Sequence, residues 1–326
     1  MKYANWNVPE RGAEIPRALL AAGCTPLLAA ILHLRGLSDP AAARSFLRGG
    51  AETLTNPLEL TGMVDAVQRL TRAVATGEHV AVYGDYDVDG ITAACLLTDY
   101  LRFRGLTCEL KIPDRIRDGY GLNTAAIDTL AEKGVTLIVT VDCGVTNLEE
   151  TAYAAQRGVD MIVTDHHECR EALPEAEAVV DPKQPDSSGV GTALAGVGVA
   201  FKLVCAMDGD ADKMLARYGD LVAVGTVADV MPLLGENRFI TRCGLQKIAA
   251  GDCRPGFLAL AEEAGVRDKP FTASTVGFSL APRINAAGRL GQVDLALELF
   301  LTDDEARARQ LAAQLCELNR ERQLIE

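Results

Sequence analysis

Short apolar runs rich in valine and isoleucine alternate with helical patterns from about residue 79 onward. The runs read HVAVYG (79–84), CELKIP (108–113), VTLIVTV (135–141) and DMIVT (160–164), and a helical pattern follows each of the first three. Near-continuous apolar strands between helices are typical of a parallel sheet that is covered on both faces. We therefore predict an α/β fold with a doubly wound, mainly parallel sheet.

Helical patterns also flank this predicted core on both sides. We read residues 1–78 as a helical lead-in, 79–200 as the α/β core, 201–300 as a mostly helical part and 301–326 as the start of a long helix. Within the core, each predicted helix ends at a glycine, the residue that helix C-termini often require. These glycines are Gly105, Gly134 and Gly158. The pattern predicts a domain over residues 1–300 followed by a connecting helix.

Composition sets further limits on the class of protein. The nine cysteines form no C-x-x-C pair, which argues against a disulfide framework or a zinc ribbon and favours a reducing cytoplasm. No run of 18 apolar residues occurs, so we expect no membrane partner. The net charge of -13 argues against broad electrostatic binding of nucleic acid, unless acidic residues gather at a metal site and basic residues cluster locally.

Acidic residues and histidines follow three of the predicted strands, at the point where each strand ends. They are Asp85, Asp87 and Asp89 after the first strand, Asp142 after the third, and Asp165, His166 and His167 after the fourth. Ligands of doubly wound sheets bind beyond the carboxyl ends of the strands. Carboxylates that share one rim repel one another unless cations compensate them. Mixed carboxylate and imidazole ligands favour manganese or magnesium, and a pair of such ions can activate water for attack at phosphorus.

Each cluster taken alone has a plainer interpretation. DYDVDG (85–90) matches the first half of a calcium loop, but Leu96 stands where that loop needs glutamate, and a strand precedes it. The calcium interpretation therefore fails, whereas a solvated acidic turn stays open. Asp142 alone is typical of a helix cap or turn, and one histidine of the pair could be structural. The joint pattern is what favours a metal site.

The series of motifs resembles the DHH phosphoesterase superfamily, named for the triplet at 165–167, and within it the RecJ family of single-strand-specific exonucleases. The segments that carry the resemblance are RGLSDPAAARSFL, GDYDVDGITA, IPDRIRDGYGLN, VDCG, TDHHE, VDPKQPD, LAGVGVAFKL, GTVADVMPL and PRINAAGRL. They cover almost the whole chain, and their combination is far more specific than the triplet alone. In this resemblance residues 1–300 are the DHH catalytic domain.

The resemblance implies a two-metal site that holds Mn²⁺ or Mg²⁺. Its metal ligands would be Asp87, Asp89, Asp142, His166 and Asp229, with Asp142 bridging both ions. From the sequence alone, Asp229 reads as a polar residue late in an apolar helix. Many superfamily members carry a metal-binding histidine where this chain has Tyr83, so we expect Asp85 to complete the first metal's ligands.

The resemblance also implies which residues meet the substrate. His167 would hydrogen-bond the scissile phosphate and stabilise its developing charge. Arg115 and Arg289 would bind phosphates, with Asn285 beside them. We thus expect Asp142, His167 and Arg289 to carry the catalysis.

These residues together predict a metal-dependent 5′-to-3′ exonuclease core that hydrolyses single-stranded DNA to mononucleotides in DNA repair and recombination. We expect a cytoplasmic monomer, with a single-strand-binding protein or a helicase as candidate protein partners. RecJ proteins continue into a DHH-associated domain that is absent here, so we expect an excised core rather than a natural short form. Two alternatives stay open: a phosphodiesterase or phosphatase for very short oligonucleotides or cyclic dinucleotides, and a non-catalytic DHH scaffold.

Overall fold

The structure, a computed structural model, describes residues 15–113, 121–187 and 189–325. The chain forms two compact units, one that ends at Leu54 and one that begins at Thr55. Each unit is described by itself. Within the described ranges, no helix is both long and apolar enough to cross a membrane.

The first unit is a small cluster of helices, α1 (Arg17–Ala21), α2 (Pro26–Leu34) and α3 (Pro40–Arg48). Its two longer helices begin with a capping residue followed by proline, a combination that favours helix initiation. The side chains of Thr25 and Asp39 accept hydrogen bonds from the backbone N–H groups of Leu28 and Ala42. The apolar faces of the helices bury a small core of Leu19, Ala29, Leu32 and Ala43.

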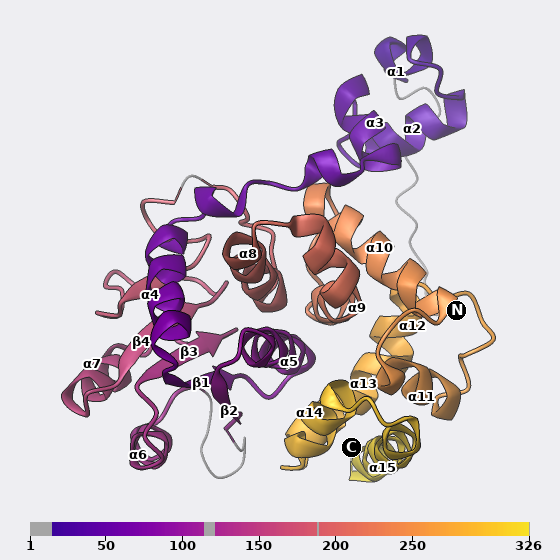
Figure 1. Ribbon diagram of the computed structural model, residues 1–326. Coiled ribbons are helices and arrows are strands. Elements are labelled where there is room, and N and C mark those ends of the chain that lie inside the picture. Colours follow the sequence, from indigo (N-terminus) through magenta and orange to yellow (C-terminus); the bar gives the residue numbers. More distant parts are fainter. Residues whose placement is uncertain (1–14, 114–120, 188, 326) are drawn as a thin grey trace. The chain divides into compact units, whose positions relative to one another are not determined.

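The second unit is built on a five-stranded sheet in the order β2-β1-β3-β4-β5, and all of its pairings are parallel (Figure 1). The strands are β1 (His79–Gly84), β2 (Thr107–Lys111), β3 (Leu137–Val141), β4 (Asp160–Thr164) and β5 (Ala178–Val180). The parallel α/β class and the first four strands were predicted, and the structure confirms them. The three-residue β5 was missed, because it is too short for its pattern to stand out.

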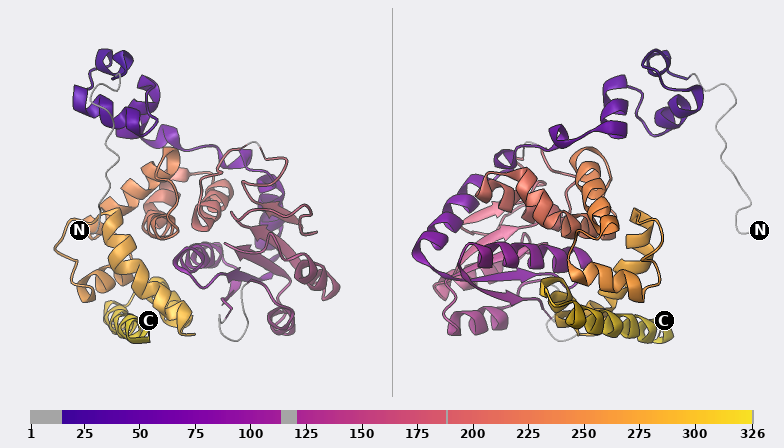
Figure 2. Two further views of the ribbon diagram at one scale, coloured as in Figure 1. Left: turned by 180° about the vertical axis from the view of Figure 1, so that it is seen from behind. Right: turned by 45° about the vertical axis from the view of Figure 1, so that its right-hand side comes forward.

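Helices cover both faces of this sheet (Figures 1 and 2). They are α4 (Met63–Thr76), α5 (Val88–Phe103), α6 (Thr124–Glu132), α7 (Leu148–Gln156) and α8 (Gly196–Asp208). Side chains alternate along a strand, so Ala81 and Tyr83 of β1 pack with α6 and α7, while Val80 and Val82 are buried toward the other face. The helices α5 and α8 pack against that other face. Burial on both faces explains why the strands read as continuous apolar runs.

Predicted helix ends at three glycines are also confirmed. Gly105, Gly134 and Gly158 have φ angles of +88°, +84° and +72°, each just beyond its helix. This left-handed conformation costs glycine little, because it has no Cβ.

The rest of the second unit is helical, as predicted. Its elements are α9 (Ala211–Ala228), α10 (Gly235–Ala250), α11 (Pro255–Glu263), α12 (Ala273–Thr275), the π-helix η3 (Val276–Leu280), α13 (Ala281–Arg289), α14 (Val293–Leu301) and α15 (Glu305–Ile325). The long α15 packs against α11, α13 and α14 (Figure 2). Asp229, which the sequence placed late in an apolar helix, is the C-cap residue of α9.

A buried ion pair joins α8 to α10. Lys202 is only 2% exposed, and its Nζ lies 2.7 Å from Oε2 of Glu236 and 2.5 Å from the carbonyl oxygen of Thr55. Glu236 also accepts hydrogen bonds from the backbone N–H and the hydroxyl of Thr55. Because all these charges are desolvated, each one depends on its partner.

We predict that Lys202→Ala lowers the free energy of unfolding by about 3–5 kcal/mol, since it leaves a buried carboxylate without its counter-charge. Lys133→Ala is the matched control, because Lys133 pairs with Glu109 at 2.6 Å but its side chain is 52% exposed. That exposed pair is worth roughly 0–1 kcal/mol. Urea denaturation followed by circular dichroism measures both changes, and equal losses would contradict the assignment.

Candidate metal centre

Three aspartates lie in a row at the carboxyl edge of the sheet. Gly84 of β1 pairs with Val141 of β3, and Val141 pairs with Thr164 of β4. The next residues along each strand are therefore neighbours, and they are Asp85, Asp142 and Asp165. The chain leaves β1 toward β2 on one side and returns to β3 on the other, so the row begins at a topological switch point, where such sheets bind ligands.

The backbone at this edge is strained. Among the described residues, the non-glycine residues with positive φ are Asp142 and Val230, each at 60°. Asp142 follows β3, and Val230 follows Asp229 at the end of α9. Such conformations cost about 1–3 kcal/mol and persist where the surroundings impose them. Both strained residues lie at the acidic cluster.

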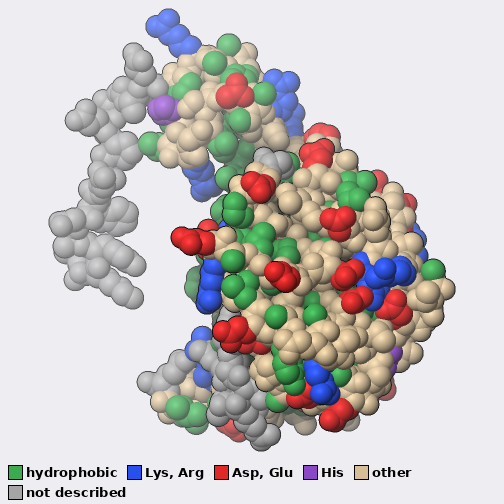
Figure 3. All heavy atoms as spheres, turned by 90° about the vertical axis from the view of Figure 1, so that its left-hand side faces the viewer, with side chains coloured by type: hydrophobic (Ala, Val, Ile, Leu, Met, Phe, Trp, Pro, Cys, Tyr) green, Lys and Arg blue, Asp and Glu red, His purple; other side chains and the backbone are tan. Residues whose placement is uncertain are grey.

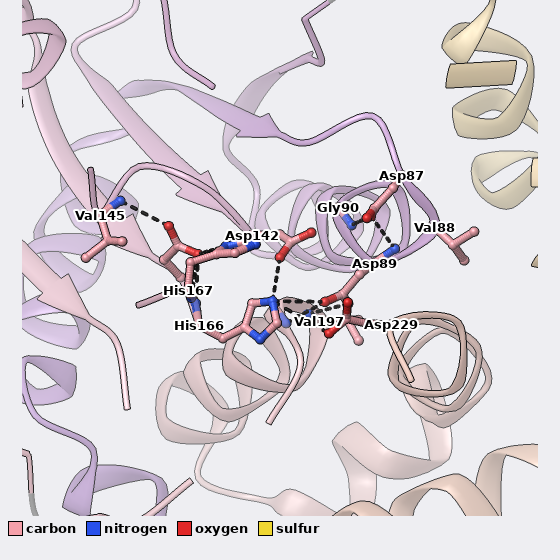
Figure 4. A network of polar contacts seen from close by, with 12 residues as sticks. Asp87, Val88, Asp89, Gly90, Asp142, Val145, His166, His167, Val197 and Asp229 are labelled. Carbon is pink, nitrogen blue, oxygen red and sulfur yellow. Dashed lines mark hydrogen bonds and ion pairs between the residues drawn. The ribbon is translucent and has the colours of Figure 1, made fainter. Parts of the chain in front are cut away.

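His166 faces three carboxylates that come from different elements (Figure 4). Its Nε2 lies 3.1 Å from Oδ1 of Asp142, 3.7 Å from Oδ2 of Asp229 and 3.8 Å from Oδ2 of Asp89. We call these four residues the His166 cluster. They bring together the ends of β3 and β4, the first turn of α5 and the C-terminus of α9.

A second group adjoins the first. Ligand atoms of Asp85, Asp87 and Asp142 lie within 4.8 Å of one another, so Asp142 belongs to both groups. Oδ1 of Asp85 and Oδ1 of Asp142 are buried, and neither has a hydrogen-bond partner among the described residues. Buried carboxylate oxygens without donors are costly, and a cation would satisfy them. Oxygen donors with one imidazole fit Mn²⁺ or Mg²⁺.

The pKa values of these aspartates in the metal-free protein show the same cost of burying carboxylates together. Burial, reinforced by Asp87, raises the pKa of Asp85 to about 7 and that of Asp229 to about 6. Burial and the neighbouring carboxylates also raise the pKa of Asp89 and of Asp142 well above the usual value.

His166 responds to burial in the opposite direction. Desolvation and the charge of His167 lower its pKa to about 4, so its imidazole is neutral near pH 7. A neutral imidazole is the form that binds a metal ion. The ring is therefore in the form that binds a metal ion, whereas burial raises the pKa of the carboxyl groups around it and so favours their protonated forms.

Two of the aspartates also organise local structure. Oδ1 of Asp87 caps α5 by accepting from the N–H groups of Asp89 and Gly90, at 2.9 and 3.1 Å. Asp89, only 1% exposed, accepts from the N–H groups of Gly196 and Val197 at the start of α8, at 2.6 and 2.9 Å. The positive end of the helix dipole thus meets a buried carboxylate.

Two glycines allow helices to approach the carboxylates closely. A Cβ on Gly196 would lie 2.5 Å from both Cβ and Oδ1 of Asp142. A Cβ on Gly225 of α9 would lie 2.4 Å from Oγ1 of Thr92 and 2.9 Å from Oδ1 of Asp89. No side chain fits at either place without moving a carboxylate or its neighbours.

Asp165 differs from the other strand-end aspartates, because its carboxylate contacts backbone N–H groups and the ring of His167. The sequence did not reveal this difference. Its Oδ1 accepts from the backbone N–H of His166 at 2.7 Å and contacts Nδ1 of His167 at 2.7 Å. Its Oδ2 accepts from the N–H of Val145 at 3.0 Å. Burial alone raises the pKa of Asp165, but the hydrogen bonds and the charge of His167 bring it below its usual value. The same hydrogen bond raises the pKa of His167.

Tyr83 lies away from the cluster. It is fully buried, and its hydroxyl donates to the carbonyl oxygen of Gly121 at 3.0 Å, while the amide of Asn123 contacts that hydroxyl at 3.4 Å. The side chain belongs to the core beneath α6 and α7, on the other face of β1. Asp85 instead approaches Asp87 and Asp142. That it completes a metal's ligands stays a prediction.

The expected phosphate-binding residues come from separate parts of the chain. Arg115 lies outside the described residues. Asn285 of α13 accepts from the N–H of Val88 at 3.2 Å, so α13 contacts the loop that carries Asp87. Arg289 is the exposed last residue of α13, and a Cβ on the preceding Gly288 would lie 2.2 Å from the carbonyl oxygen of Tyr86.

Asp181 and Lys183 are further polar residues that the sequence reasoning left without a role. Asp181 follows β5 and is fully buried, beside Asp165, whose N–H donates to the carbonyl oxygen of Val180. Burial raises the pKa of Asp181 to about 6. Nζ of Lys183 lies 3.3 Å from Oε1 of Glu168, directly after the histidine pair. The sequence did contain a clue to Asp181, because VDPKQPD again places an aspartate after a short apolar run.

Comparison with known proteins agrees with this arrangement. The DHH family, N-terminal domain, matches residues 79–226. The single-stranded-DNA-specific exonuclease RecJ of Bacillus subtilis (strain 168) is 41% identical over 300 residues, which cover 92% of this chain and 38% of that protein. A crystal structure of exonuclease RecJ bound to manganese matches with a TM-score of 0.74 at 39% identity, over 83% of this chain and 68% of that one. The chain belongs to the RecJ family.

RecJ membership confirms the resemblance that the motifs carried. The RecJ protein of Escherichia coli (strain K12) is 39% identical over 322 residues, covering 94% of this chain and 55% of that protein. RecJ from Thermus thermophilus in complex with Mn²⁺ matches with a TM-score of 0.79 at 35% identity, over 94% of this chain and 44% of that one. The chain thus spans about half the length of most RecJ relatives that it matches.

We predict that Gly196→Ala disrupts the cluster, since the added methyl group overlaps the Asp142 side chain. Manganese affinity should fall by at least about tenfold while the far-ultraviolet circular dichroism spectrum stays unchanged. Gly277→Ala is the matched control, because a Cβ there has no atom within 4 Å. Isothermal titration calorimetry measures both variants. Normal manganese binding by Gly196→Ala would contradict the close approach of α8.

Manganese affinity should weaken as the pH falls. Asp85 and Asp229, with pKa values of about 7 and about 6, are protonated at low pH in the metal-free protein, so the cation must displace their protons. His166, with a pKa of about 4, stays neutral over this range. We expect binding at pH 5.5 to be at least about tenfold weaker than at pH 8. Calorimetry in buffers of different ionisation enthalpy also counts the released protons, and a pH-independent affinity without proton release would contradict the assignment.

Proposed function

We propose that this chain is a metal-dependent exonuclease core that hydrolyses single-stranded DNA from the 5′ end to mononucleotides. The observation that carries the proposal is the pair of ligand groups that share Asp142 at the switch point of the sheet. A shared carboxylate suits two ions about 3.5–4 Å apart, the arrangement that in-line displacement at phosphorus requires. The names of the relatives, which are single-stranded-DNA-specific exonucleases, supply the substrate class.

We assign Mn²⁺ or Mg²⁺ as the cofactor, and these ions would supply an activated water and charge stabilisation at the phosphoryl oxygens. Asp85, Asp87 and Asp142 would hold one ion, while Asp89, His166 and Asp229, again with Asp142, would hold the other. Structures of RecJ proteins bound to manganese and to magnesium support this choice. The backbone N–H groups of Gly196 and Val197 keep Asp89 in place, and the strained backbone fixes the direction of Asp142.

His167 is the residue best placed to act on the substrate directly. Its ring is 46% exposed, whereas that of His166 is 8% exposed, so the two neighbours face different surroundings. Asp165 holds Nδ1 of His167 and favours the protonated ring, which leaves Nε2 as a hydrogen-bond donor for a phosphate oxygen. Arg289, at the end of α13, would add a second positive charge on the same side as the Asp87 loop.

The biological setting is a further part of the proposal. We place the activity in DNA repair and recombination, in the cytoplasm, with a single-strand-binding protein or a helicase as candidate partners. Arg115 would help to bind the DNA backbone. The small-substrate phosphodiesterase has no observation in its favour, and the dense set of ligand residues argues against a non-catalytic scaffold.

A panel of end-labelled substrates tests this function. We expect manganese-dependent release of mononucleotides from single-stranded DNA carrying a 5′ phosphate, and little from duplex DNA or cyclic dinucleotides. Asp142→Ala should reduce the rate to less than about a hundredth, because both metal groups lose their common ligand. This variant also controls for contaminating nucleases. Faster turnover of dinucleotides than of long strands, or release from the 3′ end, would refute the proposal.

Substitutions in the triplet should separate metal binding from charge stabilisation. His167→Ala should lower turnover by about 10²–10³ and keep its metal, as expected for loss of a charge-stabilising donor. Asp165→Asn should act in the same direction, since it releases His167. His166→Ala should lose metal instead. Manganese titration alongside single-turnover rates distinguishes these outcomes, and metal loss in His167→Ala with retention in His166→Ala would reverse the two roles.

A further inference from the structure

The helical unit that ends at Leu54 contains a cavity of about 340 Å³ between α1, α2 and α3. Its floor is apolar and includes Leu19 and Ala43, which are 0% and 2% exposed, and Leu28 and Leu47 form part of its walls. Arg44 and Arg48, one turn apart on α3, complete the lining. We call this cavity the α1–α3 groove. It lies wholly within one unit and far along the sequence from the metal ligands.

The charge of the groove contrasts with that of the whole chain. Its lining residues include no aspartate or glutamate. Neither Arg44 nor Arg48 forms an ion pair within the described part of the chain, and both side chains are exposed. Residues 15–54 carry four arginines and two acidic residues, although the chain as a whole has a net charge of -13. The blue side chains that project from this smaller unit in Figure 3 are its arginines.

Another cavity of the same protein is lined by cations that pair with carboxylates of the chain itself. It is lined by residues of α9, α10 and α11, including Arg217 and Arg254. There Arg217 lies 2.9 Å from Asp99, and Arg254 lies 2.5 Å from Asp220. Those cations are neutralised by the fold, and with four aspartates against three cations the lining offers no excess positive charge to a ligand. The α1–α3 groove is different, because within the described part of the chain no carboxylate pairs with Arg44 or Arg48.

An apolar floor, with two arginines that form no ion pair among the described residues, favours one kind of occupant. We propose that the α1–α3 groove binds a short peptide segment of a partner protein that carries an apolar anchor side chain next to carboxylates. The anchor would displace water from the floor, and Arg44 and Arg48 would bind the carboxylates through charge-assisted hydrogen bonds. Single-stranded DNA fits less well, because the lining offers no aromatic ring for bases to stack on. This site is independent of the nuclease function.

Fluorescence polarisation of the full chain with designed peptides tests the proposal. The probe is a labelled ten-residue peptide that alternates glutamate and leucine. Its controls replace glutamate by glutamine or leucine by alanine. We expect saturable binding of the probe that weakens with salt, and at least about tenfold weaker binding of either control peptide.

Matched variants locate the binding. Arg44→Glu/Arg48→Glu should weaken the probe at least about tenfold, whereas Arg17→Glu/Arg35→Glu, which changes as many exposed arginines of this unit outside the groove, should change it less than about twofold. Circular dichroism and nuclease rate confirm that both variants are folded. Equal weakening by the two variants, no binding of the probe, or loss of oligothymidine binding in Arg44→Glu/Arg48→Glu with the peptide unaffected would overturn the proposal. Self-association abolished by that variant alone would show a second copy as the occupant and would overturn it too.

Discussion

Burial of like charges around Asp142 is the constraint on which the rest of the second unit depends. Asp85, Asp89 and Asp142 are each at most 5% exposed, and burial raises the pKa of all three. The fold offsets part of this cost locally. The first N–H groups of α8 meet Asp89, and Asp87 caps its own helix. Glycines let α8 and α9 come near enough to close the cluster. Oδ1 of Asp85 and Oδ1 of Asp142 still have no hydrogen-bond partner among the described residues, and carboxylate oxygens are ligands that a divalent cation prefers.

The three adjacent residues of the Asp-His-His triplet have three different surroundings, and their pKa values are shifted accordingly. Asp165 is buried and accepts hydrogen bonds, so it stays ionised. His166 is buried and neutral, with a pKa of about 4, and faces the carboxylates. His167 is half exposed, and Asp165 raises its pKa. In many active sites, neighbouring groups have distinct roles because their surroundings shift their pKa values apart. Here a buried, neutral imidazole and an exposed imidazole with a raised pKa occupy adjacent positions.

Much of this arrangement could be predicted, because a parallel sheet converts sequence order into position. Residues that follow apolar strands must meet at one edge, so the clusters at Asp85, Asp142 and Asp165 were visible in the strand pattern. Contacts between distant segments were not. The hydrogen bonds from α8 to Asp89 join residues 107 and 108 positions apart, and neither segment contains a sequence pattern that predicts them. The role of Asp165 likewise depends on tertiary contacts, because its side chain accepts from the N–H of Val145 on the neighbouring strand end.

The acidic character of the chain and a polyanionic substrate are compatible only if positive charge is supplied at the reacting phosphate. On the proposed function, the protein itself would contribute little of this charge, from His167 and Arg289. On the proposed function, the carboxylates of the cluster would repel DNA until cations bind there, so cofactor binding and substrate binding would be linked by the same charges. Protonation of Asp85 or Asp229 would act on this linkage by lowering the affinity for the cations. The bound cations would thus convert a site that repels phosphate into one that binds it.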